Sequence, residues 1–198
     1  MKTIDVLDKT FSLSISEESI QEAIKTIACK MNNELADKNP IFLSVLNGAF
    51  MFTSDLLKNI DIPCELAFIR LSSYEGTDTT GSVKELVGLN CAIKNRTIVI
   101  VEDIVDTGLT MQALINTLQK HEPEEIRIAT MFFKPEKLTV SELQLHYVGM
   151  TIKNDFIVGY GLDYNEQGRN LREIYTLVWE KNAFFVPLFL IYNNKTND

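Results

Sequence analysis

Two adjacent carboxylates followed by a hydroxyl-rich turn are the residues of this chain best suited to chemistry. Glu102 and Asp103 come directly after the β-branched run TIVIV at 97–101, and the turn DTGLT occupies 106–110. Carboxylates accept hydrogen bonds from ribose hydroxyls, and backbone N–H groups at the start of a helix bind phosphate. The segment therefore predicts a site for a phosphorylated sugar.

The turn has a simpler interpretation, an ordinary strand-to-helix connection in which Asp106 caps the helix. A lone DTG would favour that interpretation. An apolar strand, two acids, two further residues, DTG and a threonine favour the phosphate site instead. The residues expected to hold the 5-phosphate are Asp106, Thr107, Gly108, Leu109 and Thr110.

A βαβ unit is expected to position these residues. The strand ending before Glu102, a helix at 107–121 and a strand at 126–133 follow one another without a linker. Continuous apolar strands covered by helices predict a mostly parallel sheet. Ligands of such sheets bind outside the carboxyl ends of the strands, which is where the two acids are expected.

Other elements are read from periodicity and turn signals. Ser16, followed by two glutamates, predicts the start of a helix over 16–35, in which the first turn favours acids. The polar stretch 72–83 lacks periodicity and predicts a long loop. Further elements are expected at 49–60 (helix) and at 41–46, 64–71, 87–92 and 156–160 (strands).

Composition narrows the class of protein. The chain has 198 residues, a net charge of −8 and a pI of about 4.9, which argues against nonspecific nucleic-acid binding. Three cysteines without CxxC spacing predict reduced thiols, no disulfide frame and no zinc site. No signal-peptide pattern and no run of about 18 apolar residues is seen, so the expectation is a cytoplasmic protein without membrane contact.

The string VEDIVDTGLT at 101–110 resembles the PRPP-binding motif of type I phosphoribosyltransferases, in the form typical of the hypoxanthine–guanine branch. The resemblance extends over roughly 10–178. It implies the type I phosphoribosyltransferase fold, a mostly parallel twisted sheet flanked by helices with a small hood subdomain from the chain termini.

The resemblance also implies one phosphoribosyltransferase domain over 1–198. The expected parts are a core at about 36–145, a hood from about 1–15 and 146–182, and an unmatched C-terminal tail at 183–198. The tail contains the apolar run FFVPLFLIY, which would be costly to expose. It would add a β-like segment to the core or be buried at a subunit interface, and we favour the interface.

The segment VLNGAFMFTSDLL at 45–57 resembles the pyrophosphate loop of the family. By that resemblance Leu46, Asn47 and Gly48 contact the pyrophosphate, and the Leu46–Asn47 peptide bond is cis. Asn47 departs from family members that carry lysine here, so its contact would be made through the backbone. Without the resemblance, the sequence predicts a strand followed by an Asn-Gly turn.

Two further segments carry residues of the implied active site. RLSSYEGTDTTG at 70–81 resembles the flexible catalytic loop, whose Ser73 and Tyr74 help to exclude water. In MFFKPEKL, Lys134 would donate to the purine O6 and so select oxopurines. Taken alone, the first segment would be a solvated connector and the lysine a surface charge.

The segment DFIVGYGLDYNEQGRNL at 155–171 is the most specific of the remaining signatures. The resemblance implies that Phe156 stacks on the purine and that the Ile157 backbone meets its edge. Asp163 would lie at the base and hold Mg²⁺, and Arg169 would contact the pyrophosphate. Without the resemblance, the first two would be core strand residues and Asp163 a turn acid.

The implied reaction transfers the 5-phosphoribosyl group of PRPP to hypoxanthine or guanine, giving IMP or GMP and pyrophosphate. Glu102 and Asp103 would organise the ribose hydroxyls and Mg²⁺, and Asp106 would act as general base beside purine N7. The implied catalytic residues are Asp106, Lys134, Ser73 and Tyr74. A homodimer or homotetramer is expected, with small-molecule substrates only.

Three other functions share part of this sequence pattern. Adenine, orotate or uracil transferases share the phosphate loop, but Lys134 and the 156–163 signature speak against them. A PRPP- or nucleotide-sensing regulator would not need Asp106, Lys134 and the Ser73–Tyr74 loop together. A nicotinamide-dependent oxidoreductase would need GxGxxG after a strand, which the sequence lacks.

Overall fold

The larger of two sheets carries the predicted site. The computed structural model describes residues 2–71, 86–87, 89 and 91–179. Six strands in the order β5-β4-β3-β6-β7-β8 form this sheet, and the pairs from β4 to β8 are all parallel, whereas β5 is antiparallel to β4. The strands are β3 (Ile41–Leu46), β4 (Glu65–Leu71), β5 (Leu86–Val87), β6 (Thr97–Val105), β7 (Glu125–Phe133) and β8 (Tyr147–Thr151). The predicted mostly parallel sheet is confirmed.

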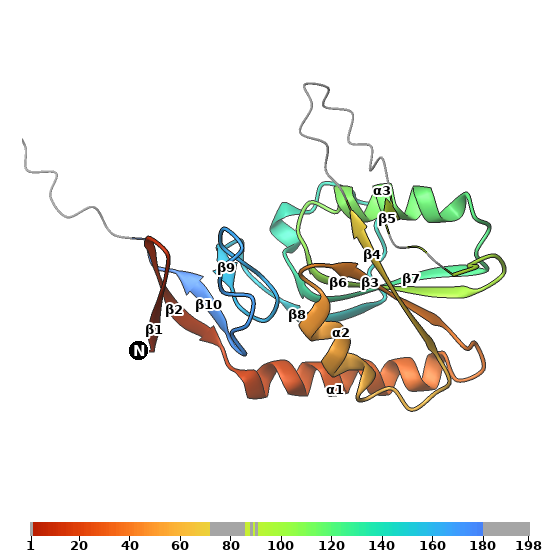
Figure 1. The fold of residues 1–198 in the computed structure, drawn as a ribbon, viewed down its shortest axis with the longest axis horizontal. Helices are drawn as coiled ribbons and strands as arrows, with labels where there is room; N and C mark the ends of the chain where they lie inside the picture. The colour runs from red at the N-terminus through yellow and green to blue at the C-terminus, as the bar shows by residue number, and fades with distance from the viewer. Residues whose placement is uncertain (1, 72–85, 88, 90, 180–198) are drawn as a thin grey trace, which may run out of the picture.

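Helices cover both faces of this sheet, and alternate strand residues face each layer. Helices α1 (Glu17–Glu34) and α2 (Phe50–Leu57) pack on one face, and α3 (Leu109–Gln119) packs on the other (Figure 1). Along β6, Ile98 and Ile100 pack with α3, whereas Val99 and Val101 pack with α1 and α2. Because β4, β3, β6, β7 and β8 are parallel, their carboxyl ends lie along one edge of the sheet.

Helix α1 begins as predicted. Ser16 has an extended backbone and its hydroxyl accepts a hydrogen bond from the Ser19 N–H at 3.3 Å. Glu17 and Glu18 lie in the first turn, where the helix dipole favours them. The buried residues of the helix recur at the spacing of one helical face and include Ile20, Ile24, Ile27 and Met31.

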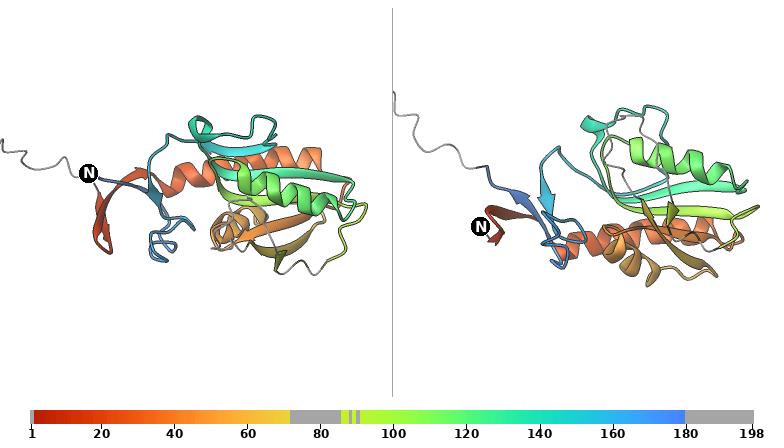
Figure 2. Two further views of the ribbon diagram at one scale, coloured as in Figure 1. Left: turned by 90° about the horizontal axis from the view of Figure 1, so that it is seen from above. Right: turned by 45° about the horizontal axis from the view of Figure 1, so that its top comes forward.

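A second, smaller sheet stands at one end of α1, with the order β1-β2-β10-β9 and all pairs antiparallel (Figures 1 and 2). Its strands are β1 (Thr3–Val6), β2 (Lys9–Ile15), β9 (Ile157–Val158) and β10 (Ile174–Leu177). Segments from both ends of the described chain contribute to this sheet, and the expected hood subdomain is likewise built from both chain termini. Strand β8 lies in the larger sheet, which differs from the hood boundary expected near residue 146.

Several element boundaries differ from expectation. The strand expected to end before Glu102 continues to Val105, so the two acids lie inside β6. The strand expected at 87–92 is described only as Leu86–Val87, and the strand expected at 156–160 is Ile157–Val158. Strands β1, β2, β8 and β10 were not predicted. They are short, and their alternating polar residues leave only a weak apolar signal.

The side-chain alternation of β6 changes phase at the two acids. Val101 and Ile104 pack on the same side of the sheet, although residues three apart should face opposite sides. Ile100 and Val105 likewise both pack on the α3 side. The pairing with β7 stays in register across the two acids, from Glu102–Thr130 to Ile104–Phe132, so the change concerns side-chain packing and is not a bulge.

Within the described ranges, no helix is long and apolar enough to cross a membrane.

Candidate functional site

The carboxylates of β6 form an acidic pair at the site edge of the sheet, in which Asp103 is buried and Glu102 is half-buried. Asp103 is only 8 % exposed, and its Oδ1 accepts a hydrogen bond from the Ile104 N–H at 2.7 Å. Oε2 of Glu102 is shielded from solvent and has no hydrogen-bond partner among the described residues. A buried oxygen without a donor is costly, and a cation or a ligand hydroxyl would relieve it.

Burial raises the pKa of both acids. Burial, followed by the negative charge of Asp103, raises the pKa of Glu102 well above its ordinary value. Burial also raises the pKa of Asp103, although the hydrogen bond with Glu102, two backbone N–H groups and the Arg169 guanidinium oppose that shift. A pair that resists full ionisation by itself is suited to binding a cation together with a polyol.

The raised pKa of Glu102 makes the stability of the ligand-free protein depend on pH. The unfolded chain releases this proton at a lower pH than the folded protein, so the free energy of unfolding falls as the pH rises above the ordinary glutamate range. We expect Glu102→Gln to remove part of this fall. At about pH 8 the variant should be more stable than the wild type, and at about pH 4 the two proteins should differ less.

Urea unfolding at about pH 4 and about pH 8 would check this expectation. Glu142→Gln, a change at an exposed glutamate, is the matched control and should leave the pH dependence as it is in the wild type. Equal stability of Glu102→Gln and the wild type at the higher pH would show that Glu102 is not a strained buried acid.

The turn after β3 packs directly against the acidic pair. Leu46–Asn47 is a cis peptide, as the resemblance implied. A Cβ atom on Gly48 would lie 1.5 Å from Asp103 Oδ2, so only glycine lets the backbone approach this carboxylate. The Gly48 carbonyl in turn lies 2.0 Å from where a Cβ on Gly161 would be. The expected pyrophosphate loop and the ribose acids are therefore contiguous.

The segment after β9 adds a cation beside this loop. The guanidinium of Arg169 donates to the Gly161 carbonyl at 2.9 Å and pairs with Asp163 Oδ1 at 2.8 Å. Asp163 Oδ2 also accepts from the Glu166 N–H at 2.8 Å. Arg169 is close enough to Asp103 for its positive charge to oppose the rise in that acid's pKa. It therefore connects the 161–169 segment to the loop at Gly48 and the acids of β6.

The predicted phosphate turn begins α3. Gly108 has φ +81°, a left-handed conformation that glycine adopts without strain, and it directly precedes Leu109, the first residue of the helix. The Thr107 carbonyl accepts hydrogen bonds from the Thr139 N–H and hydroxyl, both at 3.0 Å, which hold the turn from outside. Leu109 and Thr110 are exposed. The N–H groups of Thr107 and Leu109 donate to the side-chain oxygens Asp106 Oδ1 and Thr107 Oγ1, so the other N–H groups of this helix start are the ones suited to a phosphate.

Asp106 stands at the mouth of the turn. Its side chain is 47 % exposed, one oxygen accepts from the Thr107 N–H, and the other lies 3.7 Å from the Lys137 ammonium. Lys137 ends the 3₁₀ turn η1 (Pro135–Lys137), which follows β7. The acid is oriented by its neighbours and still open to a ligand.

A pocket of about 410 Å³ lies between the two sheets, and Lys134 and Phe156 line it. The Lys134 ammonium donates to the Asp155 carbonyl at 2.7 Å, and burial lowers the pKa of this lysine. The Phe156 ring is 42 % exposed and meets Tyr164 edge-on at a centroid distance of 5.9 Å. An open aromatic face beside a buried donor suits a planar ring that carries an oxo group.

The structure therefore brings three of the expected groups together. One group consists of the acidic pair, the turn at Gly48 and Arg169, which are contiguous. Asp106 lies next to Lys137, and Lys137 lines the same pocket as Lys134 and Phe156. Ile157 is buried in β9 beside Phe156. Ser73 and Tyr74 lie outside the described residues, as does the tail at 183–198.

Asp163 does not join the acidic pair in a ready-made metal site. Within residues 2–71 and 91–179, no cluster of three or more His, Cys, Asp or Glu side chains is arranged to hold a metal ion. Glu102 and Asp103 still fit Mg²⁺, which binds proteins through few carboxylates and takes its other ligands from phosphates and water.

Sequence reasoning missed several residues of the pocket, namely Lys9, Lys137, Tyr164, Leu177 and Trp179. Lys137 could have been found, since it follows Lys134 by three residues in a segment already singled out. Lys9 and Trp179 carried no signal, because β2 and β10 were not predicted and only their pairing brings both residues to the pocket.

Comparisons with known proteins agree with this geometry. The family model of the phosphoribosyl transferase domain matches residues 16–165. The hypoxanthine-guanine phosphoribosyltransferase of Lactococcus lactis is 42% identical over 167 residues, which are 83% of this chain and 90% of that protein. The chain spans about a quarter (24%) of the length of another relative, the bifunctional protein TilS/HprT of Listeria monocytogenes, to which it is 38% identical.

A solved structure shares the fold. The crystal structure of a hypoxanthine-guanine phosphoribosyltransferase from Bacillus anthracis superimposes with a TM-score of 0.76 at 35% identity, and the match covers 85% of this chain and 97% of that one. The expected type I fold is confirmed. The chain belongs to the phosphoribosyltransferase family, in its hypoxanthine-guanine branch.

Proposed function

We propose that this chain transfers the 5-phosphoribosyl group of PRPP to hypoxanthine or guanine, giving IMP or GMP and pyrophosphate in purine salvage. The observation that carries the proposal is the continuity of the site. An acidic pair, a phosphate-binding turn and a pocket with a buried lysine and an open aromatic ring lie along one edge of the sheet. Ribose, 5-phosphate and oxopurine each match one of these groups.

PRPP would be bound mainly by backbone and carboxylate groups. Residues 106–110 hold the 5-phosphate, and Glu102 and Asp103 accept hydrogen bonds from the ribose hydroxyls. Residues 46–48 and Arg169 receive the pyrophosphate, with Asn47 contributing through its backbone. This division is supported by the packing of Gly48 against Asp103 and by the Arg169 bond to the Gly161 carbonyl.

Mg²⁺ forms part of the proposal, because a cation would compensate the shielded Oε2 of Glu102, which has no hydrogen-bond partner among the described residues. When bound, it would screen the charge of the pyrophosphate and so make this group easier to release. Glu102 and Asp103 would hold it through the ribose hydroxyls or directly, and Asp163 would hold it near the pyrophosphate. The solvent-shielded, partnerless Oε2 of Glu102 supports the first of these positions.

Base recognition is assigned to the second pocket. The purine stacks on Phe156, Lys134 donates to O6, and the backbone of Ile157 and the region of Asp163 meet the base edge. The bond from a ring nitrogen to C1 of the ribose forms as the bond from C1 to pyrophosphate breaks, and the proton on N7 passes to Asp106. The position of Asp106 beside Lys137, which lines the base pocket, supports this role.

Ser73 and Tyr74 are proposed to cover the reacting atoms and exclude water, as the resemblance implies. We further propose a homodimer or homotetramer in the cytoplasm. The exposed apolar side chains Phe50, Leu66 and Phe68, each 42–44% exposed, support association of subunits. Sedimentation velocity would measure the subunit number. Three cysteines without disulfides support a reducing compartment.

An initial-rate assay with PRPP and Mg²⁺ tests the proposal, with hypoxanthine, guanine and adenine offered separately. We expect nucleotide formation from hypoxanthine and guanine, none from adenine, and loss of the rate when EDTA is added. If PRPP binds but no base reacts, the chain would be a PRPP sensor and the roles of Asp106 and Lys134 would be withdrawn.

A further inference from the structure

The base pocket is unusually cationic for an acidic protein. Lys9, Lys134 and Lys137 line it together with one acid, Asp155, so that lysines outnumber acids in the pocket of a chain whose net charge is −8. We propose that Lys9 is a specificity residue that binds an oxygen at C2 of the base, so that xanthine is a substrate beside hypoxanthine and guanine. This inference rests on the proposed function and names the substrate range of the same site.

The hairpin of β1 and β2 holds Lys9 at the pocket. The Tyr164 hydroxyl donates to Asp8 Oδ1 at 2.9 Å, next to Leu7, whose φ of +54° belongs to the tight turn. The Lys9 ammonium lies 5.5 Å from the centroid of the Tyr164 ring, a cation–π contact. Because Tyr164 also meets Phe156 edge-on, Lys9 is held near the ring on which the purine is proposed to stack.

Lys9 and Lys134 enter the pocket from different sheets. Lys134 follows β7 of the larger sheet, and its ammonium is bound to the Asp155 carbonyl. Lys9 opens β2 of the smaller sheet. A planar base between the two sheets can therefore meet a donor on two different edges.

Charge at the pocket favours an acceptor on the ligand. Among the described residues, Lys9 forms no ion pair with a carboxylate, and the nearest acid in sequence, Asp8, is occupied by the Tyr164 hydroxyl. Lys137 is the lysine that approaches Asp106. The Lys9 ammonium is partly shielded and reaches the Tyr164 hydroxyl, but no carboxylate among the described residues pairs with it, so a ligand oxygen can still gain a charge-assisted hydrogen bond from it.

The three oxopurines differ at C2, and this difference decides which of them can accept a hydrogen bond from Lys9. Xanthine carries an oxygen there, guanine an amino group and hypoxanthine a hydrogen. An ammonium donates to the oxygen, cannot accept from the amino group and gains nothing from the hydrogen. Xanthine is also the strongest acid of the three and is partly anionic near neutral pH, which adds attraction to a cationic pocket.

The test compares kcat/KM for xanthine, guanine and hypoxanthine in the full-length wild type and in Lys9→Met. We expect the wild type to use xanthine, and Lys9→Met to lose about tenfold or more in kcat/KM for xanthine, as expected when a hydrogen bond to a charged group is removed. The value for hypoxanthine should stay within about twofold. Lys9→Arg keeps the charge and should retain most of the xanthine activity.

Lys153→Met is the matched control, because it removes an exposed positive charge near Asn154 and Asp155 without lining the pocket. It should leave the ratio of xanthine to hypoxanthine unchanged. If the wild type uses hypoxanthine and guanine but not xanthine, or if Lys9→Met lowers all three bases equally, this inference fails and the proposed function stands. If the wild type uses none of the bases, both fail.

Discussion

Replacing Asp106 by asparagine is expected to lower kcat by about 10²–10⁴-fold, the usual contribution of a general base. Asparagine keeps an oxygen that can accept from the Thr107 N–H, so the turn that holds the phosphate should survive. The amide cannot take the proton from purine N7. We therefore expect the Kd for PRPP to change far less than kcat, as measured by calorimetry and initial rates.

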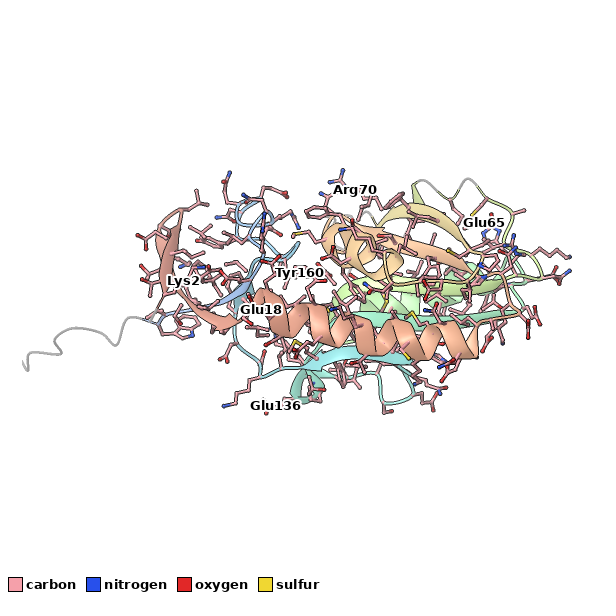
Figure 3. All side chains as sticks on the ribbon, turned by 90° about the horizontal axis from the view of Figure 1, so that it is seen from below. Lys2, Glu18, Glu65, Arg70, Glu136 and Tyr160 are labelled. Atoms are coloured by element: carbon pink, nitrogen blue, oxygen red, sulfur yellow. The ribbon has the colours of Figure 1, made fainter. Side chains whose placement is uncertain are left out.

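A charge control separates chemistry from electrostatics. Glu136→Gln removes a neighbouring negative charge from an exposed side chain of the turn η1, which points away from the protein in Figure 3. Its kcat should stay close to that of the wild type. Equal losses of PRPP affinity and turnover in Asp106→Asn would mean that Asp106 only binds PRPP, and would contradict its role as a base.

Gly48→Ala should have the second large effect. The new Cβ would fall 1.5 Å from Asp103 Oδ2, and this carboxylate cannot yield easily because it is buried and held by the Ile104 N–H. We expect kcat/KM for PRPP to fall at least about 100-fold, since displacement of a positioned group has effects of this size. The free energy of unfolding should fall by about 1–3 kcal/mol, as for other overpacked sites.

A double-mutant cycle identifies the cause of this loss. In an Asp103→Ala background the colliding oxygen is absent, so Gly48→Ala should cost much less stability than it does in the wild type. Urea unfolding of the four proteins gives the coupling free energy. If Gly48→Ala costs the same in both backgrounds, the loss comes from the turn itself and not from contact with Asp103.

Local signals in the sequence determined much of the scaffold. Ser16 and the two glutamates after it fix the start of α1, because a side-chain cap and the helix dipole act within one turn. The apolar run before Glu102, the turn at 106–110 and the apolar strand β7 define the βαβ unit, since each depends on near neighbours in the chain.

Local signals failed where tertiary contacts override them. Two adjacent acids indicated the end of a strand, yet β6 continues past them because Ile104 and Val105 still pair with β7 and are covered on both faces. Strands β1, β2 and β10 have weak patterns of their own. They are stabilised by pairing between segments from opposite ends of the described chain, which no local window contains.

The sequence by itself determined which residues could bind a phosphorylated sugar, namely the acids and the turn of the βαβ unit. Only the tertiary structure decided what surrounds them. The contacts of Gly48 with Asp103 and Gly161, and the arrival of Lys9 at the pocket of Lys134, join residues far apart in the chain. Such contacts depend on how whole elements pack, and packing is set by shape and burial across the molecule.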